Sequence, residues 1–198
     1  MPKARLCLWV ALVGLACLAP GACGLFKTRS PMKPPPGGSA CRSLAGGPIA
    51  AVIPNIQDFY GRVSGLTCYS SLLDTAFVFH PDPQDSAQVL PQTPYVGWNE
   101  VVEADVNSKI ANLQDFIDVR FPSEYTNPII SNDQETHFFN YQLRLSYKSA
   151  PDTVRYSGRA DVTFQRGTDG QWRITDWADH RGAVSDSTWG LLRADHRS

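Results

Sequence analysis

The longest regular pattern in the chain is an alternation of apolar and polar residues over positions 154–164. A period of two predicts a half-buried antiparallel strand. The predicted inner face carries Val154, Tyr156, Gly158, Ala160, Val162 and Phe164. Because Gly158 and Ala160 are small, they would let a helix or a ligand approach this face closely.

The dipeptide Asp169-Gly170 predicts the turn that ends this strand. We expect a type I′ turn, which requires positive φ at both central residues. The return strand covers residues 171–177 and places Trp172 on one face and Trp177 on the other. A strand with tryptophan on both faces is expected to be covered on both, at least in part.

Helical spacing precedes these strands. Residues 49–63 carry apolar side chains at intervals of three and four, which predicts a helix that Pro54 either begins or kinks. A short helix is predicted over residues 66–74, with Leu72 and Leu73 facing inward. A third helix is predicted over residues 98–113, with its apolar residues in one stripe. The stripe consists of Trp98, Val102, Val106, Ile110 and Leu113.

Shorter alternating patterns predict the remaining strands. They cover residues 77–80, 117–121 and 137–147, and a proline-rich loop follows the first. Residues 187–193 are expected to dock as a last turn. The predicted order is helix, helix, strand, loop, helix and four antiparallel strands, which is typical of the α+β class.

Composition and charge narrow the range of functions. The chain has 198 residues and a net charge of −1, and it shows no basic stripe and no internal repeat. No nucleic-acid partner is therefore expected. The length suits one globular domain with additional segments.

The N-terminus has the pattern of an export signal. Lys3 and Arg5 precede an apolar run over residues 6–18, which is too short to span a bilayer comfortably. Small residues then lead to Cys23 in a sequence that resembles a bacterial lipobox, although Pro20 stands where an aliphatic residue is usual. Cys17 is a weaker candidate for lipidation. An ordinary secretory signal with incidental cysteines is the alternative.

These features predict three segments: a signal peptide over residues 1–22, a lipidated Cys23 with a Pro/Gly-rich tether over residues 23–47, and a folded domain over residues 48–198. The acyl chains would hold the protein on a membrane surface in the bacterial cell envelope. Because Gly24 is not the aspartate that retains some lipoproteins at the inner membrane, we expect the outer membrane, facing the periplasm.

Two further cysteines allow a disulfide. Cys41 and Cys68 could pair in an oxidising compartment. The alternative, a buried free thiol at Cys68, is favoured because Cys41 lies in a segment with no other sign of order.

The order of elements resembles the NTF2-like (SnoaL-like) cone fold. The resemblance covers residues 48–193 and rests on AFVFHPDP at positions 76–83 and on YSGRADVTFQR…DGQWRITDWAD at positions 156–179. The ending WRITDWADHR…STWGLLR is similar to that of bacterial NTF2-like lipoproteins of unassigned function. The resemblance implies a curved sheet that wraps a helix around a pocket, and it selects no activity.

In such a cone, the pocket would be lined by the apolar strand faces and the first helices. The candidates are Tyr60, Tyr69, Phe79, His137, Tyr141, Tyr156, Trp172 and Trp177. His137 is the candidate acid or base because a partly buried imidazole can exchange protons near neutral pH. A structurally hydrogen-bonded histidine is the commoner arrangement at a strand start.

Two polar clusters are further candidates. His80, Asp82 and Asp85 could bind a metal but fit turn chemistry better, so no metal site is expected. Asp179 and His180 could form a proton-shuttling pair at the mouth of the cone. Asp179 could instead accept backbone hydrogen bonds where the strand ends.

The sequence therefore predicts a non-catalytic domain that binds a small apolar ligand or a protein partner. The alternative is an isomerase, dehydratase or cyclase that works by acid–base chemistry. No cofactor is expected in either case. A third possibility, which the resemblance implies, is a homodimer formed through the sheet, with the outward Arg144, Arg155 and Arg159 as rim or salt-bridge residues.

Overall fold

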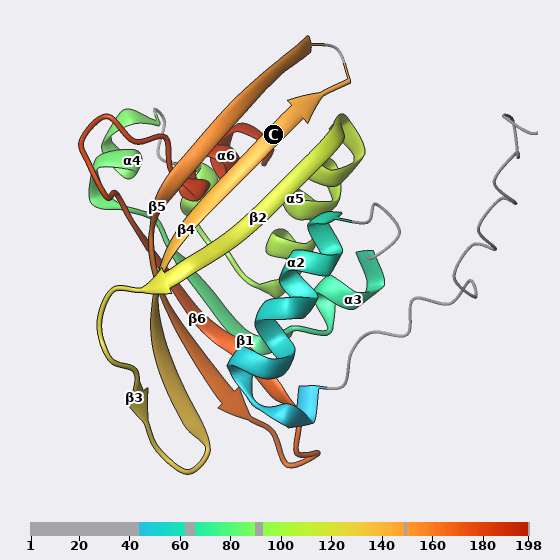
Figure 1. Cartoon of the computed structure of the whole chain (residues 1–198), viewed down its shortest axis with the longest axis vertical. Helices are drawn as coiled ribbons and strands as arrows, with labels where there is room; N and C mark the ends of the chain where they lie inside the picture. Colours follow the sequence, from blue (N-terminus) through green and yellow to red (C-terminus); the bar gives the residue numbers. More distant parts are fainter. Residues whose placement is uncertain (1–43, 62–65, 90–92, 149, 198) are drawn as a thin grey trace, which may run out of the picture. The chain divides into compact units, whose positions relative to one another are not determined.

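A computed structural model describes residues 44–61, 66–89, 93–148 and 150–197 (Figure 1). The predicted signal peptide, Cys23 and most of the predicted tether lie outside these residues, so those predictions stay predictions. Within the described residues, no helix is both long and apolar enough to cross a bilayer.

One mixed sheet is the centre of the fold. Its strands are β1 (Leu73–His80), β2 (Gln114–Glu124), β3 (Ile129–Ile130), β4 (Gln134–Tyr147), β5 (Ala150–Arg166) and β6 (Trp172–His180). The order is β1-β6-β5-β4-β2, and β3 pairs with β4. All neighbours are antiparallel except β1 and β6, which run parallel. The four long antiparallel strands and the α+β class are as predicted.

The helices lie mainly on one side of this sheet (Figure 1). They are η1 (Leu44–Gly46), η2 (Pro48–Val52), α2 (Ile53–Gly61), α3 (Leu66–Ser70), α4 (Pro83–Gln88), η3 (Thr93–Tyr95), α5 (Glu100–Leu113) and α6 (Trp189–Asp195). Pro54 is the second residue of α2, directly after the π-helical turn η2. This position suits proline because its missing N–H falls in the first turn of the helix.

Several predicted boundaries were wrong. The helix over 66–74 stops at Ser70, and Leu73 is instead the first residue of β1. The predicted loop contains α4, in which Asp82 caps the N-terminus by accepting a hydrogen bond from Gln84 N at 2.8 Å. Leu113 is 52% exposed, so it is not part of the buried stripe of α5.

A bulge in β6 corrects the prediction that its tryptophans lie on opposite faces. Ile174 pairs with Phe164 and Asp176 pairs with Thr163, which leaves Thr175 as an extra residue in the strand. Because the extra residue shifts the alternation, Trp172 and Trp177 both face the core. One face of β6 therefore holds both rings.

The turn between β5 and β6 also differs from the predicted type. Gly170 has a φ of 76°, whereas no non-glycine residue among those described has positive φ. Gly170 N donates to Gly167 O at 2.9 Å. The turn therefore has one left-handed residue, at Gly170, instead of the two that a type I′ turn requires.

Cys68 is buried, as expected, but it is disulfide-bonded, so the prediction of a free thiol was wrong. The other four cysteines of the chain lie outside the described residues. Pairing with Cys41 remains a prediction.

Candidate functional site

The C-terminal helix α6 lies between the sheet and the helices α2 and α5. Thr188 caps its N-terminus by accepting a hydrogen bond from Leu191 N at 3.2 Å. Trp189, Leu192 and Arg193 are fully buried. The spacing of Trp189 and Leu192 places both side chains on one face of the helix, so a seven-residue helix fills the interior.

Trp189 is the centre of an aromatic cluster. Its ring lies 5.0 Å from that of Trp177 and 5.6 Å from those of Tyr60 and Tyr141, measured between centroids. Its backbone N–H donates to the Tyr141 hydroxyl at 2.8 Å. The cluster therefore connects α2, β4, β6 and α6 through one side chain.

Gly158 makes this contact possible. A Cβ atom at position 158 would lie 2.5 Å from the Tyr141 hydroxyl and 2.6 Å from the His180 carbonyl oxygen. The absence of a side chain therefore lets Tyr141 lie across β5 and reach α6. At Gly158, the structure thus confirms the expectation that a small residue in this strand allows a close approach.

Arg193 and Glu103 form a fully buried ion pair between α6 and α5. Arg193 Nη2 donates to Glu103 Oε1 at 2.7 Å, and both side chains are 0% exposed. Tyr69 Oη and Trp98 Nε1 also donate to the Glu103 carboxylate, each at 2.7 Å. The Arg193 guanidinium lies 4.4–4.9 Å from the rings of three aromatic residues. These are Phe79, Trp177 and Trp189.

Asp179 is an enclosed carboxyl group beside α6. It is 1% exposed, and its Oδ2 atom accepts a hydrogen bond from Gly190 N at 2.6 Å. Burial raises the pKa of Asp179 to about 7, against the opposing effect of the nearby Arg193 charge. Asp179 can therefore hold a proton near neutral pH, which is a property of many catalytic acids.

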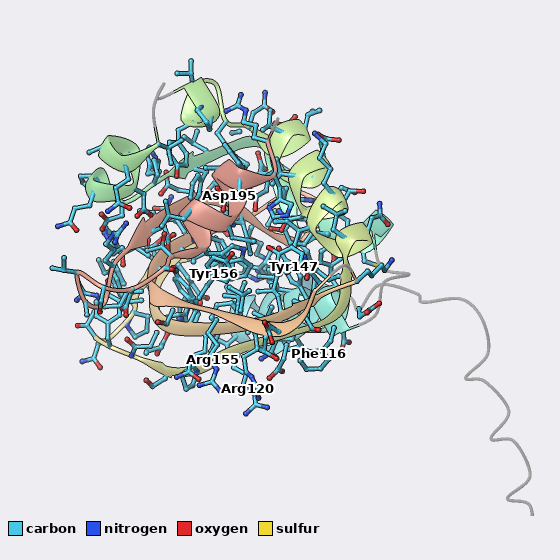
Figure 2. The ribbon with its side chains drawn as sticks, turned by 90° about the horizontal axis from the view of Figure 1, so that it is seen from above. Phe116, Arg120, Tyr147, Arg155, Tyr156 and Asp195 are labelled. Carbon is cyan, nitrogen blue, oxygen red and sulfur yellow. The ribbon has the colours of Figure 1, made fainter. Side chains whose placement is uncertain are left out.

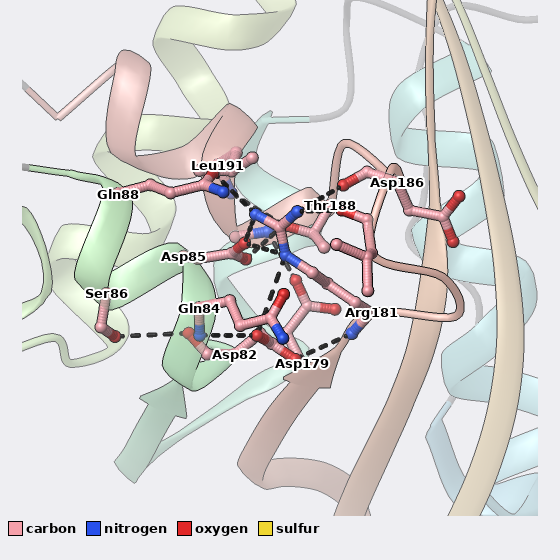
Figure 3. Close-up of polar contacts among 12 residues, drawn as sticks. Asp82, Gln84, Asp85, Ser86, Gln88, Asp179, Arg181, Asp186, Thr188 and Leu191 are labelled. Atoms are coloured by element: carbon pink, nitrogen blue, oxygen red, sulfur yellow. Dashed lines mark hydrogen bonds and ion pairs between the residues drawn. The ribbon is translucent and has the colours of Figure 1, made fainter.

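A polar cluster connects the chain after β6 to α4 (Figure 3). Arg181 Nε donates to Asp85 Oδ1 at 2.9 Å, and Arg181 N donates to Asp82 Oδ2 at 2.9 Å. The Thr188 hydroxyl donates to Asp85. Gly190 lies between the two acids: a Cβ there would be 3.0 Å from Asp179 Oδ2 and 3.1 Å from Asp85 Oδ2. The start of α6 is thus fixed by two carboxylates.

The architecture matches known structures at low sequence identity. A conserved protein from Planctomyces limnophilus has a TM-score of 0.54 at 15% identity, over 66% of this chain and 90% of that one. A candidate scytalone dehydratase from Novosphingobium aromaticivorans has a TM-score of 0.52 at 10% identity, over 71% and 91%. An NTF2-like superfamily protein from Salmonella enterica has a TM-score of 0.44 at 11% identity, over 68% and 91%.

The fold is the α+β cone predicted from the NTF2-like resemblance, and the structures with TM-scores above 0.5 share it. No protein-family model matches the sequence, and no curated protein matches it. Because the structural matches are below 25% identity, the likeness concerns the fold of the chain alone.

Five of the eight predicted pocket residues surround α6 inside the NTF2-like cone. These are Tyr60, Tyr69, Phe79, Tyr141 and Trp177. Tyr156 lies on the same inner side, near Tyr147 and Asp195 (Figure 2). Trp172 is buried nearer the start of β6. All of them are less than 10% exposed, so their rings contribute to the core.

His137 is held by two carboxylates away from α6. Its Nδ1 atom lies 2.6 Å from Glu124 Oε1 and its Nε2 atom 2.8 Å from Glu135 Oε2. The ring stacks on Phe139 with an interplanar angle of 8°. Both ring nitrogens have a partner, which agrees with the structural alternative considered for this residue.

The predicted pairing of Asp179 with His180 does not occur. Successive residues of a strand point to opposite faces. Asp179 accordingly faces the core, whereas His180 Nε2 lies 3.1 Å from Asp161 Oδ2 and is partly exposed. The charged residues that act on Asp179 are Arg193, which lowers its pKa, and Asp85, which raises it.

The cluster after β1 performs the turn and capping roles that were favoured for it. His80 pairs with Asp176 at 2.8 Å, Asp82 caps α4, and Asp85 binds Arg181. Within the part of the chain that the structure describes, no group of three or more His, Cys, Asp or Glu residues is arranged to hold a metal ion.

Sequence reasoning missed the buried ion pair of Glu103 and Arg193. Glu103 and Asn107 occupy the stripe of α5 together with Val106 and Ile110. A carboxylate at such a position must be paired or neutralised, so Glu103 was a detectable signal of a buried partner. Arg193, in the apolar segment that was expected to dock, is that partner.

Proposed function

We propose that the protein is an exported, lipid-anchored and non-catalytic NTF2-like domain of the bacterial cell envelope. It would bind a small apolar ligand or a protein partner. The observation that supports this proposal is the position of α6. Trp189, Leu192 and Arg193 are fully buried between the sheet and α5, where a substrate would have to enter. Binding would therefore take place beside the cone.

The anchor rests on the sequence pattern around Cys23. Metabolic labelling with an alkyne fatty acid and membrane fractionation of the full chain would test it. We expect Cys23→Ala to remove the label and to release the protein from the membrane fraction. Cys17→Ala is the matched control and should leave both unchanged. A protein that is unlabelled and soluble before mutation would contradict the lipoprotein proposal.

The second candidate is a cofactor-independent isomerase, dehydratase or cyclase. It is favoured by Asp179, whose pKa is raised by burial to about 7 and whose Oδ1 atom has no hydrogen-bond partner. Such an enzyme would require α6 to move, because Gly190 covers the Oδ2 atom.

Native mass spectrometry of the full chain, purified from its own host, distinguishes the two functions. A co-purifying compound that the protein converts, with conversion lost in Asp179→Asn, would establish the enzyme. The non-catalytic proposal predicts that a bound molecule stays chemically unchanged and that Asp179→Asn and His137→Ala do not alter its capture.

A further inference from the structure

The outer face of the sheet, away from α6, has a hollow with a volume of about 350 Å³. This volume is at the lower end of the range for small-molecule sites. Leu143 and Tyr156 also line the hollow, but their side chains lie on the opposite, inner face of the sheet and are buried there. The polar lining residues are Asp118, Arg120, Gln142, Arg144, Arg155 and Ser157.

The strand register arranges these six residues in two rows across β2, β4 and β5. Asp118, Arg144 and Arg155 are directly opposite one another in one row. Arg120, Gln142 and Ser157 form the next row, two residues along each strand. Because residues two apart on a strand share a face, all six side chains belong to the outer surface. Figure 2 shows Arg120 and Arg155 projecting from this surface.

The hollow is positively charged although the chain as a whole carries −1. Three arginines face one aspartate. Arg120 Nε binds Asp118 Oδ2 at 2.8 Å, so this aspartate already has a cationic partner. Among the described residues, neither Arg144 nor Arg155 forms an ion pair with a carboxylate.

The pair Arg144 and Arg155 does not stabilise the sheet. Like charges directly opposite on neighbouring strands repel each other. Two adjacent guanidinium groups instead offer several N–H donors in a planar arrangement that matches the oxygens of a carboxylate or a phosphate. Gln142 and Ser157 add neutral hydrogen-bonding groups beside them.

We propose that this hollow binds a small anionic ligand through an oxyanion group, either a phosphate or a carboxylate. Arg144 and Arg155 hold the oxygens, and Asp118 orients Arg120 at the edge of the site. The inference does not depend on the lipid anchor or on the absence of catalysis, because it rests on the outer face of the sheet alone.

A homodimer centred on the same hollow fits the charges less well. In a two-fold symmetric contact, the same surface meets itself. Arg144 and Arg155 would then lie against the same arginines of the second copy, with one aspartate from each copy to offset them. An anion from solution neutralises the pair without this repulsion.

Isothermal titration calorimetry of the full chain at low salt tests the proposal with three probes: inorganic phosphate, pyrophosphate and citrate. We expect saturable binding of at least one of them, weaker in added sodium chloride. Binding of the phosphates alone would identify a phosphate site, and binding of citrate alone a carboxylate site. No binding of any probe would overturn the proposal.

The double variant Arg144→Gln/Arg155→Gln locates the site. We expect its affinity to fall by about tenfold or more, the loss expected when charge-assisted hydrogen bonds are removed. The matched control is Arg159→Gln/Arg166→Gln, which removes the same charge from exposed positions of β5 outside the hollow. Equal losses in the two double variants, or no loss in the first, would refute a site at Arg144 and Arg155. Because all four side chains are exposed, both variants should fold, and circular dichroism would verify this.

Discussion

Arg193 of α6 donates to Glu103 of α5 at 2.7 Å, and neither side chain is exposed to solvent. The two residues are 90 positions apart in the chain. Their contact therefore connects the C-terminal helix to the long helix across the interior of the cone. Removing two charges from water costs free energy, which this pair offsets through hydrogen bonds from Tyr69 and Trp98 and through the rings around Arg193.

The first prediction concerns this pair. Arg193→Met would leave Glu103 buried without its counterion and should lower the free energy of unfolding by about 3–5 kcal/mol. The double variant Glu103→Gln/Arg193→Met should lose less than the sum of the single variants, because the isolated charge is removed as well. Urea denaturation at neutral pH measures the free energy of unfolding of Arg193→Met, Glu103→Gln and the double variant.

Lys109→Met on the same helix is the control. Lys109 forms an exposed ion pair with Asp105 at 3.0 Å. Exposed pairs contribute about 0–1 kcal/mol, so this variant should be nearly neutral. An Arg193→Met variant as stable as Lys109→Met would show that the buried pair contributes little.

The second prediction concerns Asp179 and pH. Burial raises the pKa of its folded form from 3.8 to about 7. Between these values, the folded state holds a proton that the unfolded state has released, so the contribution of Asp179 to stability is complete below about pH 4 and is lost as the pH rises to about 7. The slope from this group is at most about 1.4 kcal/mol per pH unit.

Asp179→Asn should remove this slope, because an amide does not titrate. Relative to wild type, the variant should therefore become more stable as the pH rises from 5 to 8. Urea denaturation at several pH values measures the difference. Asp152→Asn, at an exposed position of β5, is the control and should follow wild type. A constant difference between Asp179→Asn and wild type would mean that Asp179 titrates normally.

The sequence predicted the parts of the fold that depend on local periodicity. Alternation located β4 and β5, and apolar spacing located α2 and α5. The bulge at Thr175 was not predictable, because an extra residue is defined only by its pairing with another strand. This bulge decides that Trp177 and Asp179 face the core, so the placement of these two residues depended on it.

Several residues around α6 were candidates from the sequence, including Tyr60, Tyr141 and Asp179, whereas Trp189 and the Glu103–Arg193 pair were not. The strand pattern correctly assigned Tyr141 to an inner face. Glu103 was overlooked because acidic residues in helices are usually exposed. Its position in the stripe of α5 was the available signal, but its partner Arg193 comes from a helix 90 residues later. Contacts of this kind depend on the tertiary fold and have no local sequence pattern.

The third prediction concerns Gly158. Alanine there would place its Cβ 2.5 Å from the Tyr141 hydroxyl and 2.6 Å from the carbonyl oxygen of His180. Because that carbonyl belongs to the backbone of β6, neither strand can move without loss of pairing. Gly158→Ala should therefore lower the free energy of unfolding by about 1–3 kcal/mol, as overpacking does.

Gly46→Ala is the matched control for this substitution. Its added Cβ would meet only the Ala50 Cβ, at an ordinary distance of 3.9 Å. Thermal denaturation should show a clear decrease in Tm for Gly158→Ala and almost no change for Gly46→Ala. Equal melting temperatures would mean that β5 and Tyr141 separate more easily than the packing suggests.

The fourth prediction tests whether Trp189 holds α6 inside the cone. Its ring contacts those of Tyr60, Tyr141 and Trp177, and its side chain is fully buried. Trp189→Ala should cost about 3–5 kcal/mol of stability, the usual loss for a buried tryptophan. Because α6 loses its ring contacts to α2, β4 and β6 in this variant, its backbone amides should exchange with solvent faster than those of β4 and β5.

Trp172→Ala separates this effect from general destabilisation. Trp172, the first residue of β6, is buried like Trp189 but makes no ring contact with it. Hydrogen exchange followed by mass spectrometry should show faster exchange confined to α6 in Trp189→Ala, whereas Trp172→Ala should leave α6 as protected as the strands around it. If α6 stays protected in Trp189→Ala, the polar contacts of the helix are sufficient to hold it: the Glu103–Arg193 pair and the carboxylates at its start. The aromatic cluster would then contribute stability without determining the position of α6.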